Sequence, residues 1–145
     1  MQGVCPVGWH LPRKQEWKTL IAVAGGEETA GGMLKARNGW RYCNGFGVVS
    51  CKHKDAYDYF GFTALSFGDS LGKCSWKFLS GFFPRTPYAN FWSATGNYED
   101  ESIYMKIGGF NSRAELLYSR KDTLFSVRCV KDDVKRKSIA VATDT

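Results

Sequence analysis

The chain has 145 residues, the ordinary size of one domain, and a domain of this size buries about two thirds of its unfolded surface. It contains five Trp, seven Tyr, ten Phe and sixteen Gly, which favours a loop-rich domain over a helical bundle. The net charge of +6 is scattered, without basic runs interleaved with aromatics, so we expect no nucleic-acid partner. No apolar run approaches the roughly 20 residues of a membrane span.

The first predicted element is a helix that follows Pro12 and ends at Gly25–Gly26. A second, shorter helix is predicted from Thr29, as its N-cap, to about Ala36. The first helix rests on apolar residues at the i, i+3, i+4, i+7 spacing of one helix face. These residues are Trp17, Leu20, Ile21 and Ala24.

Residues 40–90 show no sustained period and predict short strands and loops. Beyond them the pattern becomes that of strands, because Ile103, Met105 and Ile107 alternate with polar positions. The segments RAELLYS and LFSVRCV follow as two further strands. Helices followed by an antiparallel meander indicate the α+β class.

The five cysteines contain no CxxC pair and are widely spread, a pattern that favours disulfides in an exported domain. Cys43 and Cys51 flank a Gly-rich hairpin loop, so we expect them to pair. Which cysteine remains unpaired is open, and Cys74 is the candidate. A zinc site that uses Cys51 and His53 is the alternative, although paired short spacings are missing.

Five segments carry a resemblance to a known family: CPVGWHLPRKQEW, GGMLKARNGW, GFTALSFG, FWSATG and SVRCVKD. In this order and spacing they resemble the Fibrobacter succinogenes major paralogous domain family, from Cys5 to Asp132. The resemblance implies a C-type-lectin-like fold with two helices, a small antiparallel sheet, long loops and adjacent chain ends. We therefore expect one lectin-like domain over residues 1–132 and a flexible polar tail over residues 133–145.

The resemblance also implies a cellular location. The family occurs on exported and surface-anchored bacterial proteins, often lipoproteins, so we expect an extracellular or cell-surface location, although the first residues lack the apolar core of a secretion signal. Adjacent chain ends imply a disulfide between Cys5 and Cys129. We expect Trp9 and Leu11 to fill the core beside it. Arg13 stands where the family usually has a Thr that caps the first helix.

Catalytic motifs are absent from the sequence, which has no GxSxG, HExxH or P-loop. His10 has no nucleophile motif to partner it, so we interpret it as a packed or hydrogen-bonded structural residue. The acidic run Glu99–Glu101 offers oxygen ligands, but the sugar-binding calcium motifs of C-type lectins do not occur. We expect no cofactor and no enzyme. The alternative is a formylglycine-generating-type or other thiol-dependent enzyme that uses Cys129.

The candidate binding surface lies on the C-terminal meander, between the FWSATG and SVRCV segments. Tyr, Asn and Arg are enriched in recognition surfaces, and aromatic rings with flanking amides suit carbohydrate. Lectin-like domains of diversity-generating systems place variable residues in a similar stretch. We expect recognition of a glycan or protein ligand at the cell surface; a purely structural domain of a surface lipoprotein is the further alternative. The predicted ligand-binding residues are Asn97, Tyr98, Tyr104, Asn111, Arg113 and Tyr118.

Overall fold

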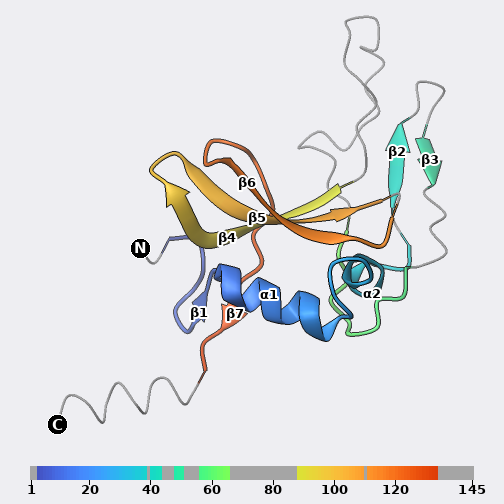
Figure 1. Cartoon of the computed structure of the whole chain (residues 1–145), viewed down its shortest axis with the longest axis horizontal. Coiled ribbons are helices and arrows are strands. Elements are labelled where there is room, and N and C mark those ends of the chain that lie inside the picture. The colour runs from blue at the N-terminus through green and yellow to red at the C-terminus, as the bar shows by residue number, and fades with distance from the viewer. Residues whose placement is uncertain are drawn as a thin grey trace, which may run out of the picture.

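A computed structural model of the chain (Figure 1) describes residues 3–38, 40–43, 48–50, 56–65, 88–109 and 111–133. Two helices and antiparallel strands confirm the α+β class. The elements are β1 (Trp9–His10), α1 (Lys14–Val23), α2 (Ala30–Leu34), β2 (Arg41–Cys43), β3 (Val48–Ser50), β4 (Tyr88–Tyr98), β5 (Glu101–Gly108), β6 (Ala114–Arg120) and β7 (Val130–Lys131).

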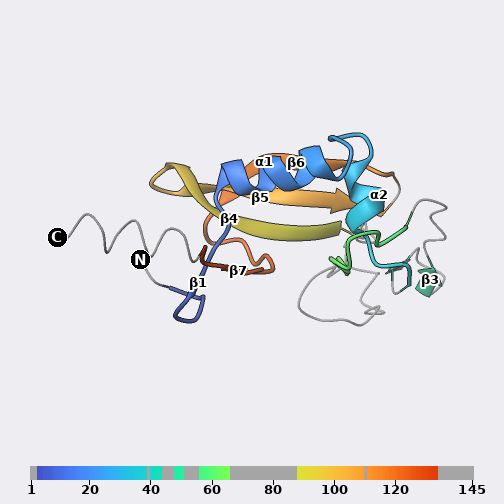
Figure 2. The ribbon, with the colours of Figure 1, turned by 90° about the horizontal axis from the view of Figure 1, so that it is seen from below.

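The centre of the fold is a three-stranded antiparallel sheet in the order β4-β5-β6. Helix α1 lies along one face of this sheet (Figure 2). Two short antiparallel pairs complete the described strands: β2 with β3, and β1 with β7. Because β1 and β7 stand near opposite ends of the sequence, their pairing brings the two ends of the described chain together.

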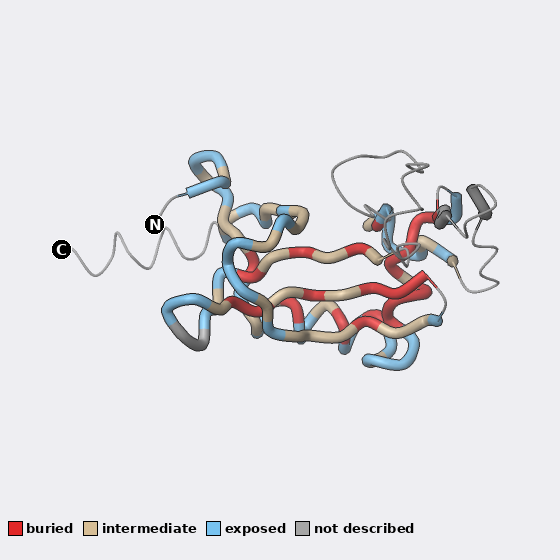
Figure 3. Tube along the Cα trace, turned by 90° about the horizontal axis from the view of Figure 1, so that it is seen from above, coloured by how far each residue is buried: buried red, intermediate tan, exposed pale blue. Residues whose placement is uncertain are grey.

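The core lies between α1, α2 and the sheet. Trp17 and Ile21 of α1 are buried, as the helical spacing predicted, and they belong to one cluster with Phe91, Met105 and Ile107. Buried and half-buried positions alternate along the central strands (Figure 3), which confirms the period-two pattern of β5. One face of the sheet therefore belongs to the core, and the positions between the core residues point to the other face.

The second helix is shorter than expected. It ends at Leu34, because Lys35 is extended and forms a parallel bridge with Ala64. Thr29 is the N-cap residue, yet its side chain makes no capping hydrogen bond. Inside the helix, a Cβ on Gly31 would stand 2.2 Å from the backbone oxygen of Arg113. The small residues of this helix thus let it press directly against the start of β6.

Strand β4 corrects the prediction for the middle of the chain. It is the longest strand, with 11 residues, and it begins inside the stretch predicted as irregular. The LFSVRCV segment, predicted as the third meander strand, instead contributes a single parallel bridge between Ser126 and Phe91. Ser126 exchanges backbone hydrogen bonds with Asn90 and Trp92 there. The segment then leaves the sheet to reach the chain-end junction.

The N-terminal segment turns as expected but buries different side chains. The Trp9 N–H donates to the Pro6 oxygen across 3.0 Å, and Gly8 takes a φ of +86° that favours glycine. Trp9 is 42% exposed, so the prediction that it fills the core is wrong. Successive strand side chains point in opposite directions, and His10, not Trp9, turns toward α1. Pro12 and Trp17 are the buried residues of this segment.

The first helix obtains its cap from the sheet. Arg13 provides no side-chain cap, and the Lys14 N–H donates instead to Thr95 Oγ1 of β4 across 2.9 Å. The same part of β4 also holds Pro12, just before the helix. Ser93 Oγ and the Ala94 N–H both donate to the Pro12 oxygen. The FWSATG segment therefore fixes where α1 begins.

We expect Thr95→Val to lower the free energy of unfolding by about 1 kcal/mol, since it removes the acceptor of an otherwise unpaired helix N–H. Urea unfolding followed by circular dichroism measures this loss. The matched control is Thr19→Val, the same change on the exposed side of α1, where the hydroxyl only donates back to the Gln15 oxygen. Equal losses in the two variants would contradict the capping role.

Candidate binding face of the sheet

The sheet face turned away from α1 carries a row of polar side chains. Asn90 of β4 pairs in register with Lys106 of β5, and Lys106 pairs with Glu115 of β6. Their positions alternate with the core residues, so the three side chains share the opposite face. All three are half-buried. We call Asn90, Lys106 and Glu115 the polar row.

An aromatic cluster borders the polar row on one side. Trp92 and Tyr104 are cross-strand neighbours with ring centroids 6.3 Å apart. Phe125 packs on both rings, at 4.7 Å from Trp92 and 4.4 Å from Tyr104. Such contacts restrain aromatic rings to one arrangement. The cluster therefore presents aromatic rings in one fixed arrangement beside the polar row.

A single aromatic ring, that of Tyr88, borders the polar row on its other side. Tyr88 is two residues before Asn90 in β4 and pairs in register with Gly108, which has no side chain to cover it. The Lys106 Nζ lies 4.0 Å from the Tyr88 ring centroid, within the range of a cation–π contact. The polar row thus lies between aromatic rings on two sides.

Charges alternate along the row and continue past its end. The Arg113 Nε lies 2.8 Å from Glu115 Oε1, and Arg113 also reaches Glu28 at 3.3 Å. Burial raises the pKa of Tyr104, and the charges of Glu115 and Tyr88 raise it further. The Tyr104 hydroxyl therefore keeps its proton at neutral pH and remains a hydrogen-bond donor.

One acceptor in the row has no hydrogen-bond partner among the described residues. The Asn90 Oδ1 atom is buried and accepts no hydrogen bond in the described part of the chain. A buried polar atom without a partner costs free energy, and such atoms are commonly satisfied by water or a ligand. Within the described ranges, the row therefore contains an amide whose oxygen accepts no hydrogen bond.

The family comparison agrees with the resemblance drawn from the sequence. The family model of the Fibrobacter succinogenes major domain matches residues 1–131. The chain belongs to this family. Comparisons with curated proteins and with solved structures give no significant match.

In this Fibrobacter succinogenes major domain, side chains of the GGMLKARNGW and GFTALSFG segments serve the fold. Lys35 is fully buried and its Nζ donates to the Asn111 backbone oxygen across 2.9 Å. Trp40 donates through Nε1 to the Ala64 oxygen, and Phe62 packs on Trp17. These motif residues hold the core together, and the polar row lies outside the segments that carry the family resemblance.

The domain brings three of the six predicted binding residues to one region. Tyr104 borders the polar row, Arg113 pairs with Glu115 at its end, and Asn111 Oδ1 accepts the Arg113 backbone N–H. The other three lie elsewhere. Asn97 and Tyr98 stand at the far end of β4, and Tyr118 pairs in register with Ile103, on the α1 face, where it is 48% exposed.

Sequence reasoning did not select the residues at the centre of this face. Lys106 was one of the positions that alternate with the apolar residues of its strand but was not assigned to a site, and Asn90 lay at the end of the stretch predicted as short strands and loops. The alternation of buried Ala89, Phe91 and Ser93 is the signal that would have located them, because the residues between must face the other way.

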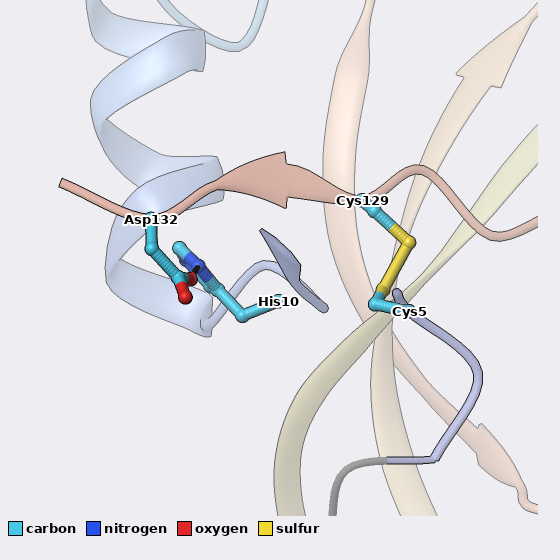
Figure 4. Close-up of a disulfide and its surroundings, with 4 residues drawn as sticks. All are labelled: Cys5, His10, Cys129 and Asp132. Atoms are coloured by element: carbon cyan, nitrogen blue, oxygen red, sulfur yellow. Dashed lines mark hydrogen bonds and ion pairs between the residues drawn. A yellow bond between two sulfur atoms is a disulfide. The ribbon is translucent and has the colours of Figure 1, made fainter. Parts of the chain in front are cut away.

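The predicted bridge between Cys5 and Cys129 is confirmed, with a Cα–Cα distance of 5.8 Å (Figure 4). Neither sulfur is a free thiol. The expected Cys43–Cys51 pair, Cys74 and His53 lie wholly or partly outside the described residues, as does the tail beyond residue 133. Within the described ranges, no group of three or more His, Cys, Asp or Glu side chains is arranged to hold a metal ion. No described helix is both long and apolar enough to cross a membrane.

Proposed function

We propose that this domain is a non-enzymatic binding module with a C-type-lectin-like fold, part of an exported or cell-surface protein, that recognises a glycan or protein ligand. The observation that carries the proposal is the polar row of Asn90, Lys106 and Glu115 between aromatic rings. The chain-closing disulfide supports the location, since disulfides persist in oxidising compartments.

The chemistry of the face suits a polyhydroxylated ligand. Aromatic rings stack on the C–H faces of sugars, while amide, ammonium and carboxylate groups bond hydroxyls. Tyr88 and Trp92 stand four residues apart on one strand, which is about 13 Å. This spacing favours an extended ligand that reaches both rings. The same residue types also serve protein recognition, so a polypeptide is the second ligand class of this proposal.

We expect Asn90→Ala and Lys106→Ala each to weaken ligand binding about tenfold, as removal of a central polar contact does. A glycan array and pull-downs from a cell-surface protein fraction identify the ligand, and titration calorimetry measures the affinities. The control is Lys18→Ala, which removes an exposed lysine from α1 on the opposite face.

Two results would overturn the assignment. Unchanged binding in both polar-row variants would remove the face from consideration, and loss of binding in Tyr118→Ala alone would move the site to the other face. Absence of any ligand for the folded wild-type domain would favour the purely structural alternative. A reactive thiol at Cys129 in the folded protein would favour the thiol-dependent enzyme.

A further inference from the structure

His10 contacts a carboxylate through each of its ring nitrogens. Its Nε2 lies 2.7 Å from Glu16 Oε2, and its Nδ1 lies 2.7 Å from Asp132 Oδ1. Figure 4 shows His10 and Asp132 facing each other on the α1 side of the junction, with the disulfide of Cys5 and Cys129 on the other side of β1 in this view. The imidazole therefore connects three parts of the fold: strand β1, helix α1 and the chain just after β7.

These contacts lie on the junction of the two chain ends. His10 pairs in register with Val130, which directly follows Cys129. The Asp132 N–H donates to the Gly8 oxygen across 2.8 Å, so backbone and side-chain bonds join the same two segments. Cys5 and Cys129 are half-buried at this junction, so opening of the junction would expose their sulfurs further to a reductant.

The two contacts require a protonated ring. A carboxylate only accepts hydrogen bonds, whereas a neutral imidazole has one N–H and one lone pair. Neutral His10 donates to one carboxylate and turns its lone pair toward the other. The imidazolium donates to both, and each bond is then charge-assisted. Deprotonation thus replaces one attraction by a repulsion.

We propose that His10, Glu16 and Asp132 form a pH-sensitive latch that, while His10 is protonated, holds the chain-end junction closed and protects the Cys5–Cys129 disulfide from reduction. The latch is independent of the proposed ligand-binding face. It lies at the junction near the start of α1, whereas the polar row lies on the sheet face turned away from that helix.

The electrostatic surroundings favour the charged ring. The hydrogen bond with Glu16, followed by that with Asp132, raises the pKa of His10 above 6.5, and partial desolvation opposes the rise. Arg13, before α1, and Lys131, in β7, are cations of the same segments, and neither forms an ion pair with the latch carboxylates in the described part of the chain. A further carboxylate, Asp133, directly follows Asp132 in the sequence.

The sign of the pH dependence follows from the raised pKa. The latch contributes its full stability below about pH 6.5, the pKa of an unfolded-state histidine. This contribution is lost as the pH rises through the higher pKa of folded His10. A switch with this sign closes in acid and loosens in alkali.

The test is the rate at which a phosphine reduces the disulfide of the full chain. The phosphine breaks the S–S bond and takes the oxygen of one water to become its oxide, while the hydrogens of that water complete two thiols. Alkylation and peptide mass mapping report the reduction at Cys5 and Cys129. Comparison of His10→Gln with wild type at each pH cancels the pH dependence of the reductant itself.

We expect His10→Gln to be reduced about fivefold faster than wild type at about pH 6, and within about twofold of it at about pH 9. The double variant Glu16→Gln/Asp132→Asn should behave like His10→Gln. An NMR titration of the folded protein should place the pKa of His10 above the pKa that His53 shows in the urea-unfolded chain. The control is Asp122→Asn, which breaks the exposed pair with Arg120 and should match wild type at both pH values.

Equal rates for wild type and His10→Gln at about pH 6 would overturn the latch. The same ratio of the reduction rates of His10→Gln and wild type at both pH values would also overturn it, because the contact would then not depend on protonation of His10. A pKa of His10 at or below that of an unfolded histidine would contradict the required charge state directly.

Discussion

Replacing Cys5 and Cys129 together by Ser should lower the free energy of unfolding by about 5 kcal/mol in a loop-closure picture, the largest loss we expect from any change considered. The bridge spans a sequence separation of 124 residues, and a long closed loop restricts the unfolded chain more than a short one. The midpoint of thermal unfolding should fall by about 15–20 °C. Differential scanning calorimetry measures both quantities.

The control is the wild-type protein after complete reduction, which should unfold at the same temperature as the double variant under the same reducing conditions. The variants Cys5→Ser and Cys129→Ser should each resemble the double variant, because either one opens the loop. A loss below about 1 kcal/mol would show that the unfolded chain gains little from release of the bridge.

Gly31→Ala should destabilise the domain by about 3 kcal/mol, the second largest effect. The added Cβ would lie 2.2 Å from the Arg113 oxygen and 2.8 Å from the Ser112 oxygen, and both are backbone atoms. Neither can swing aside as the end of a side chain would, so α2 must move away from β6. Denaturant unfolding measures the loss.

Gly3→Ala is the matched control, because a Cβ there has no neighbour within 4 Å. Its stability should stay within about 0.5 kcal/mol of wild type. If Gly31→Ala were equally silent, the close packing of α2 on the start of β6 would be contradicted.

Periodicity predicted the elements whose two faces differ strongly in polarity. Helix α1 and strand β5 each place large apolar side chains on one face, and both were correctly predicted. Strand β4 was missed because its second half holds small residues and two register irregularities, on either side of Gly96. Ser93, Ala94 and Thr95 make the hydrogen bonds that hold Pro12 and cap α1.

The candidate face was harder to predict, since it depends on register between three strands. Asn90, Lys106 and Glu115 are adjacent only because β4, β5 and β6 align in one particular way. A single sequence carries no direct record of that alignment. Tyr104 was found because its own strand alternates clearly, whereas Trp9 was wrongly assigned to the core beside the chain-end disulfide.

The closed junction also determines how the domain responds to mechanical force. Cys5 and Cys129 stand near the two described ends of the chain and are joined covalently. Tension applied to those ends passes through the sulfur–sulfur bond, and the residues between the two cysteines carry none of it. Within the described chain, extension is limited to the segments that lie outside the bridge. The sheet and its polar row should therefore keep their shape while the chain is pulled.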